Sequence, residues 1–197
     1  MQKLIISSFI LFSTLIYSQV AIGKTSVTNA TVSLEFGISN STDGYKGILI
    51  PWVSTVSGTP NASYTGVLNP VDGTIIFDVS DKKVKYRKAG AWFELSKNEI
   101  TTVDGVINYD TTGVANTTLQ DNLIENFTAK VMIGGNSSTD TATGILVLAD
   151  TNKAMILPKM DSPHLNIINP LAGMMAYDTT AKQLAIFNGK VWSFWKP

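Results

Sequence analysis

Few side chains in this sequence could carry out acid–base or metal chemistry, and the most suggestive are two aspartates. Asp78 and Asp178 stand 100 positions apart, each at the end of a similar apolar segment. Two carboxylates facing across a cleft would suit glycoside hydrolysis, but an aspartate after a strand commonly accepts hydrogen bonds from the amides of a tight turn. The single histidine, His164, has no cysteine in the chain to complete a metal site. We therefore predict turn-forming aspartates, an ordinary loop histidine, no catalytic residue, no metal and no cofactor.

The four tryptophans are better candidates for binding a ligand. Trp92 and Trp192 are also 100 positions apart, which predicts that each closes the core of its own structural unit. Trp52, Tyr64 and Trp195 offer an alternative role, because exposed flat rings can stack on the faces of sugars. A carbohydrate-binding module is therefore one hypothesis for this chain.

These pairs belong to a longer internal repeat. Residues 69–92 and 169–192 align without a gap, and six of the 24 positions are identical. Unrelated segments of average composition would share about one or two. Upstream, an apolar phrase ending in proline also occurs twice, and the repeat positions that we single out are Pro51 with Pro158, Gly73 with Gly173, Asp78 with Asp178, and Trp92 with Trp192. Such a repeat indicates one supersecondary unit used more than once.

The closing part of each copy predicts a three-stranded meander. In the second copy we expect strands at 174–178, 184–187 and 191–195. Asn188-Gly189 lies between the last two and is a strong hairpin signal, because both residues tolerate the positive φ of a type I′ turn. Ala89-Gly90 is a weaker version in the first copy.

The two ends of the chain differ in character. Lys3 followed by the apolar residues 4–17 is typical of a secretory signal peptide. This apolar stretch is too short for a membrane span. We therefore expect cleavage to remove residues 1–18. We then expect a β module at 19–95, a spacer at 96–129 and a second β module at 130–197. In the spacer, Asn116 could cap a short helix through residues 118–127. No later segment is apolar enough to span a bilayer, so we predict a secreted protein that is periplasmic, at the outer surface or extracellular.

Composition excludes some partners and favours others. The chain has 15 basic and 15 acidic residues and one arginine, Arg87, so no basic stripe is available to neutralise nucleic-acid phosphates. It also has no cysteine, so disulfides cannot stabilise it. Stability must then come from β-packing, from docking of the repeats or from association of copies.

The repeated phrases together resemble a known type of protein. Residues 46–51 (KGILIP) and the closing pattern of 169–192 (NPxxGMxxYDT…LxxFNGxxW) resemble secreted bacterial surface proteins, and related phrases occur in the β-rich shafts and tips of phage tail fibres. The resemblance implies β-rich, repeat-built and often trimeric extracellular modules, and it carries over no catalytic residue. Trp52 departs from the pattern, because a basic residue such as Lys159 is expected after the proline.

We therefore interpret the chain as a mainly β protein of two homologous small modules, built from meander and hairpin units and joined by a spacer with one short helix. The leading functional prediction is a non-enzymatic structural or adhesive surface protein, a fibre-like repeat subunit. A homo-oligomer is expected, with a trimer favoured, and a glycan or another cell-surface group is the alternative partner. Gly189 completes the repeat positions as the turn residue of the last hairpin.

Overall fold

The structure, a computed structural model, confirms a mainly β protein. It describes residues 19–39, 44–55, 64–65, 67, 70–97, 99–104, 106–110, 113–118, 126, 128–136 and 138–196, with backbone alone at 54–55, 64–65, 99–103 and 106–110. Its one described helix is the four-residue α2 (Pro163–Asn166), which lies in the second predicted module. The predicted signal peptide and most of the predicted spacer helix at 118–127 lie outside the described residues.

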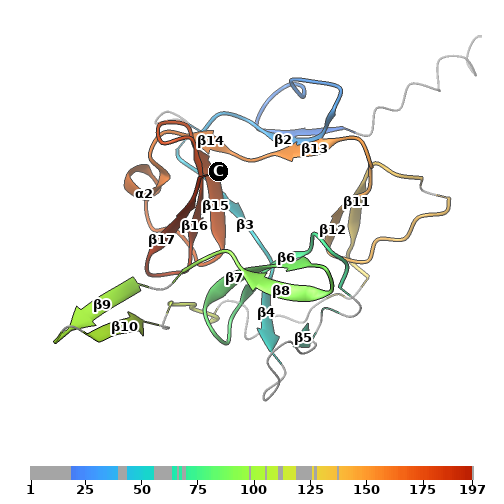
Figure 1. The fold of residues 1–197 in the computed structure, drawn as a ribbon. Helices are drawn as coiled ribbons and strands as arrows, with labels where there is room; N and C mark the ends of the chain where they lie inside the picture. The colour runs from blue at the N-terminus through green and yellow to red at the C-terminus, as the bar shows by residue number, and fades with distance from the viewer. Residues whose placement is uncertain are drawn as a thin grey trace, which may run out of the picture.

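The first copy contains the expected meander. Short segments separated by turn residues form three antiparallel strands, and a fourth strand runs parallel to the first of them. A short fifth strand extends the sheet, whose order is β5-β4-β6-β7-β8 (Figure 1). The strands are β4 (Trp52–Thr55), β5 (Tyr64–Thr65), β6 (Ile75–Asp78), β7 (Lys83–Lys88) and β8 (Ala91–Glu94).

The second copy repeats this arrangement with the same register. Asp78 pairs with Lys83 in the first meander and Asp178 pairs with Gln183 in the second. Likewise, Trp92 lies opposite Arg87, and Trp192 lies opposite the equivalent Phe187. The strands of the second copy are β14 (Lys159–Met160), β15 (Met174–Asp178), β16 (Gln183–Phe187) and β17 (Trp192–Trp195).

Each copy opens with a pair of parallel strands. β1 (Val20–Ile22) runs parallel to β2 (Val32–Phe36), and β11 (Val131–Ile133) runs parallel to β12 (Leu146–Leu148). A backbone hydrogen bond closes each pair at the same point, from Gly37 N to Ile22 O at 2.8 Å and from Ala149 N to Ile133 O at 2.9 Å. The repeat therefore extends from the opening strands to the closing meander.

Strands of the two copies also pair with each other. β13 (Ala154–Ile156) of the second copy lies beside β2 of the first in a parallel ladder. In turn, β3 (Ile48–Leu49) of the first copy pairs with β15 of the second (Figure 1). The module boundaries at 95 and 130 stay a prediction. Two sheets contain strands from both predicted modules.

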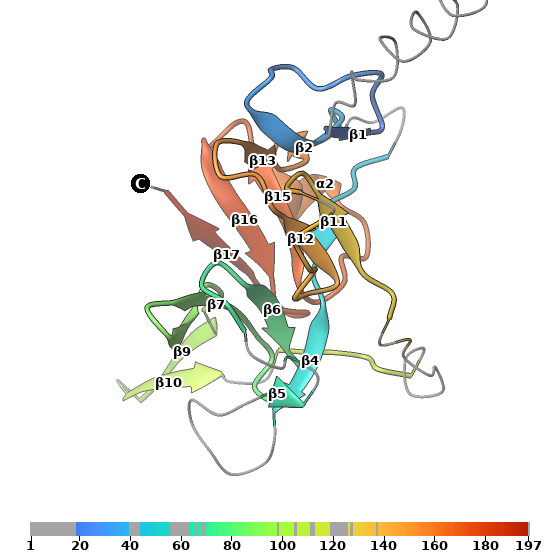
Figure 2. The same cartoon turned by 90° about the vertical axis from the view of Figure 1, so that its right-hand side faces the viewer.

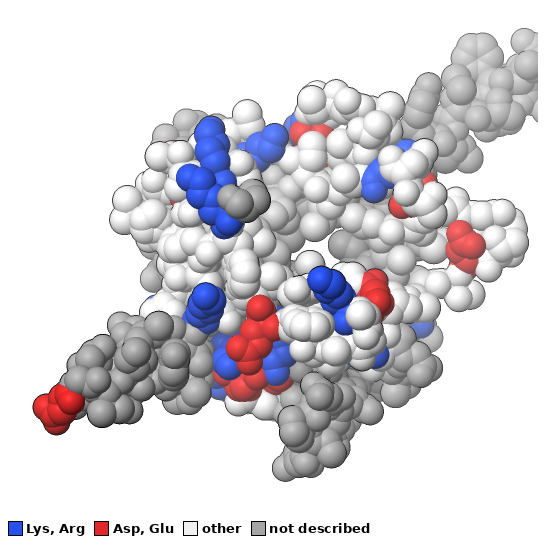
Figure 3. All heavy atoms as spheres, viewed as in Figure 1, with Lys and Arg blue, Asp and Glu red and all other residues white. Residues whose placement is uncertain are grey.

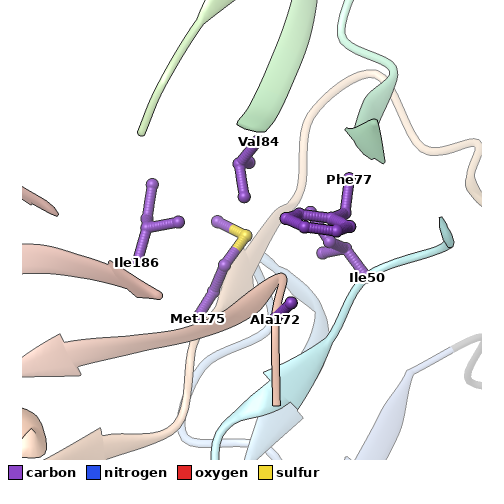
Figure 4. Close-up of a cluster of buried hydrophobic side chains, with 6 residues drawn as sticks. All are labelled: Ile50, Phe77, Val84, Ala172, Met175 and Ile186. Carbon is purple, nitrogen blue, oxygen red and sulfur yellow. The ribbon is translucent and has the colours of Figure 1, made fainter. Parts of the chain in front are cut away.

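The main core lies between the two meanders. Ile50, Phe77 and Val84 of the first copy pack against three side chains of the second copy, which are Ala172, Met175 and Ile186 (Figure 4). Phe77, Val84 and Ile186 are 0% exposed. Because neither meander encloses this cluster alone, each copy needs the other to bury these side chains.

The spacer contains a hairpin of its own. β9 (Glu99–Val103) and β10 (Val106–Asp110) pair antiparallel and form a separate two-stranded sheet. Figures 1 and 2 both show this hairpin at the edge of the molecule, on the side of the first meander. After it, the chain at Gly113 and Val114 returns to the body and contacts the turn at Asn188-Gly189.

The last turns of the two meanders differ from each other. Ala89 and Gly90 have φ of 49° and 75°, as a type I′ turn requires, whereas positive φ at Asn188-Gly189 is confined to the glycine. The prediction of a type I′ turn at Asn188-Gly189 is therefore wrong. The reason is that the Asn188 side chain accepts hydrogen bonds from the amides of Lys190 and Val191, at 2.9 and 2.8 Å, and forms a longer turn.

Candidate functional site

The two repeat aspartates are buried where their strands end. Asp78 is 0% exposed, and its carboxylate accepts hydrogen bonds from the Ser80 amide at 2.8 Å and from Lys85 Nζ at 2.8 Å. Lys85 also forms an ion pair with Asp81. Although burial of Lys85 by itself would lower the pKa of its ammonium group, the two carboxylates raise that pKa above its usual value. These charged side chains thus connect the two strands across the β6–β7 turn.

Asp178 fills the same place in the second copy with other partners. Its Oδ1 accepts hydrogen bonds from the amides of Ser162, Thr180 and Ala181, at 3.3, 2.9 and 3.0 Å. Burial alone would raise the pKa of Asp178, but these amides together bring it below its ordinary value. The two aspartates belong to different sheets, and both serve turns.

The prolines and glycines of the repeat hold backbone positions. The carbonyls of Pro51 and Pro158 accept hydrogen bonds from Phe77 N and Tyr177 N, each at 2.8 Å, and so start the parallel pairing in both copies. Gly73 and Gly173 have φ of 90° and 80° at the entry to the first meander strand.

Two of these glycines also permit close approaches. A Cβ at Gly173 would lie 3.0 Å from the Cβ of Phe77, and one at Gly189 would lie inside the carbonyl of Val114. A larger residue at Gly173 would push the two copies apart, and one at Gly189 would push the spacer away from the second meander.

The tryptophans proposed for sugar stacking lie in different places. Trp52 is half-buried beside the core, with its ring centroid 5.6 Å from that of Phe77 and its Nε1 donating to Ala172 O at 2.8 Å. Trp195 is 40% exposed, donates its Nε1–H to Leu95 O, and has Lys97 Nζ 5.8 Å from its ring centroid. The side chain of Tyr64 lies outside the described residues. The structure therefore places Trp52 and Trp195 in separate sheets.

Trp92 and Trp192 are equivalent in register but have different neighbours. Trp192 packs with Phe187 at 5.2 Å and against a second buried cluster that contains Met160. Trp92 lies beneath the Arg87 guanidinium, at 5.6 Å. One ring thus contributes to an apolar core, and the other supports a cation on the sheet surface.

Sequence reasoning missed a group of exposed apolar side chains around α2. Leu165, Ile168 and Leu171 are 74%, 84% and 52% exposed, and we call these three residues the α2 patch. His164 in the same helix stacks edge-on against Phe194 of β17 at 5.4 Å, and Phe194 is itself 41% exposed. The available signal was the absence of any Asp, Glu, Lys or Arg from 162 to 177.

The described residues contain no group of three or more His, Asp or Glu side chains that could hold a metal ion. No helix among them is long and apolar enough to cross a membrane.

Comparison with known families gives one match. Residues 133–196 match the model of a family described as a phage tail like trimerisation region. Neither the search of curated proteins nor that of solved structures finds a match. The C-terminal part of this chain, from β11 through β17, is therefore similar to a tail-fibre-like trimerisation region.

Proposed function

We propose that this chain is a structural, fibre-like subunit that assembles as a homotrimer through its C-terminal region. The observation that carries the proposal is the match of residues 133–196 to a phage tail-like trimerisation region. That description is structural, and the proposed role is accordingly non-enzymatic. An adhesive role at a cell surface would follow from display of the spacer and the first copy outside the trimer.

The exposed apolar surface supports association. The matched segment carries seven large hydrophobic side chains that are at least 40% exposed, namely Ile145, Leu146, Leu165, Ile168, Leu171, Phe194 and Trp195. Exposed apolar patches on soluble proteins mark sites of protein–protein contact, and five of these seven side chains lie on α2, on the segment after it and on β17. Burial of such side chains between copies would supply stability that a chain without cysteine cannot obtain from disulfides.

The test is the solution mass of residues 19–197. We expect light scattering after size exclusion to give three times the chain mass, with dissociation only on strong dilution. A mass of one chain over the whole concentration range would overturn the proposal, and a stable dimer would overturn the trimer.

We also propose that the protein is secreted and acts in the periplasm, at the outer surface or outside the cell. Support comes from the apolar segment at 4–17 behind Lys3, which has the pattern of a secretory signal peptide. Mass spectrometry of the protein from its native host should find Gln19 at the N-terminus. Recovery of the chain with Met1 in the cytoplasm would contradict this.

A carbohydrate-binding role is the second candidate, because Trp195 keeps 40% of its surface exposed at the end of β17. Glycan-array binding that Trp195→Ala abolishes, with Trp92→Ala as the matched control, would favour this role. Binding unaffected by Trp195→Ala would remove it.

A further inference from the structure

The α2 patch is a set of apolar side chains held outward by a fixed backbone. Exposed and buried residues alternate along this segment: Pro163 and Ile167 are buried, while Leu165 and Ile168 are exposed. Ile167 packs in the cluster of Met160 and Ala176. Because Pro163 and Ile167 already occupy the buried positions, Leu165 and Ile168 cannot turn into the core of their own chain.

Hydrogen bonds fix the two ends of the segment. Ser162 N donates to the buried Asp178 carboxylate at 3.3 Å, and Asn166 Nδ2 donates to Asp161 O at 2.8 Å. At the other end, Gly173 N donates to Phe187 O at 2.8 Å. A surface fixed in this way loses little conformational entropy when a partner covers it.

The patch lacks the charges that normally keep a protein surface in water. No Asp, Glu, Lys or Arg occurs from 162 to 177. In Figure 3 the edge where α2 lies in Figure 1 is largely white, whereas charges of both signs gather below β7. Depletion of charged residues is typical of the centre of a protein–protein interface.

We propose that the α2 patch contacts a second copy of this chain and forms the centre of the interface between copies. This inference rests on the proposed trimer and names its contact surface. A second copy is the occupant that the observations favour, because the patch lies inside the segment that is similar to a trimerisation region. The Phe194 ring, which contacts His164, continues the apolar surface onto β17.

The repeat provides a matched control. Val71 is the equivalent of Leu171 at an offset of 100 and is 55% exposed, against 52% for Leu171. It lies in the first copy, outside the matched segment. Glutamate at either position therefore has a similar cost in the isolated chain, and only Leu171→Glu would place a charge in the proposed interface.

The experiment compares Ile168→Glu, Leu171→Glu and Val71→Glu in residues 19–197, by sedimentation and light scattering over a concentration series. We expect the two patch variants to weaken association by at least about 30-fold, the loss typical of a central interface residue. Val71→Glu should keep the wild-type mass. Circular dichroism shows whether each variant remains folded.

A second readout does not depend on a disruptive charge. Because the chain has no cysteine, Ile168→Cys and Val71→Cys each introduce a single thiol. In the assembled protein, maleimide should modify Cys at 168 at least about tenfold more slowly than Cys at 71, and dilution to monomer should remove the difference.

The outcomes separate the two proposals. A wild-type monomer overturns the trimer and this inference together. A wild-type trimer in which Ile168→Glu remains trimeric, with a thiol at 168 as reactive as one at 71, overturns the α2 patch alone. Weakened association with slowed labelling supports the α2 patch.

Discussion

The two meanders have the same register but opposite surfaces. β7 of the first meander has the sequence KVKYRK, and its ion pairs join Lys83 to Glu94 and Lys85 to Asp78. β16 of the second meander has the sequence QLAIF, without a charge. Backbone hydrogen bonds and the buried face set the pairing, so the other face can change freely. One copy has kept charged side chains at Lys85 and Arg87, whereas the equivalent Ala185 and Phe187 of the other copy are apolar and buried.

The largest test of this comparison concerns the shared core. Phe77→Ala should lower the free energy of unfolding by about 3–5 kcal/mol, because Phe77 is 0% exposed between the copies. The equivalent Tyr177→Ala should cost about 1–2 kcal/mol, since Tyr177 is half-buried. Urea denaturation at fixed protein concentration measures both. Two separate unfolding transitions, or equal losses of stability in the two variants, would contradict a core that the copies share.

The next largest difference in stability is expected between variants of the two repeat aspartates. Asp78→Asn removes the charge that Lys85 Nζ faces at 2.8 Å in a buried site and should cost about 3 kcal/mol. Asp178→Asn keeps an Oδ1 acceptor for its three amides and should cost about 1 kcal/mol. Equal losses in chemical denaturation would show that the ion pair contributes nothing beyond turn capping.

The pH dependence of Asp178 follows from the direction of its shift. Its pKa in the folded protein lies below the ordinary 3.8, so its contribution to stability is present above pH 3.8 and is lost as pH falls further. Asp178→Asn should remove that part of the acid sensitivity.

The opening strands provide a sharper acid test. Glu35 is 4% exposed and accepts hydrogen bonds from Lys24 Nζ and Thr28 N, both at 2.6 Å, and from Thr28 Oγ1 at 2.7 Å. Led by the bond from Lys24, these contacts lower its pKa from 4.5 to about 2. Stability from this group is therefore complete above pH 4.5 and lost as pH falls toward about 2.

Acid titration by circular dichroism checks this expectation. Glu35→Gln should flatten the loss between about pH 4.5 and pH 2. Asp150→Asn in the second copy is the comparison: its carboxylate is paired with Lys153 at 3.1 Å and has a pKa below its ordinary 3.8, so this variant should flatten only the part of the loss below about pH 3.8. An unchanged acid profile in Glu35→Gln would contradict the assignment.

The smallest effects concern the hairpin turns. Asn188→Ala removes the acceptor of two amides and should cost about 1–2 kcal/mol. Ala89→Asn should instead stabilise by about 0.5–1 kcal/mol, because asparagine tolerates the φ of 49° better than alanine. Thermal unfolding measures both, and the same sign for the two variants would contradict the difference in turn type.

The sequence was sufficient to predict the two meanders, because the residues that recur in both copies fix the backbone at strand ends. Pro51, Gly73 and Asp78 accept or donate main-chain hydrogen bonds at strand ends, as do their equivalents. Such positions restrict which residue fits, so they recur in the sequence and indicate the register.

Pairing between copies could not be predicted in the same way. The apolar phrase at 46–51 would fit any sheet edge, and nothing local directs β3 to β15. The turn at Asn188 was mistaken because the side chain competes with the type I′ geometry that the dipeptide otherwise favours. Leu165, Ile168 and Leu171 have the sequence pattern of ordinary core residues, and only their surroundings reveal them as exposed.

The pairing of β2 with β13 determines when this protein can fold. Leu34 near the start of the chain lies opposite Met155, and Ile48 lies opposite Met175. Contacts between residues so distant in sequence slow folding, because a long loop must close before they form. A nascent chain therefore leaves the ribosome with its first sheet unfinished until β13 has been synthesised. The secretion proposed above would benefit from such a delay, because a chain that is still unfolded could cross a membrane before its native structure forms.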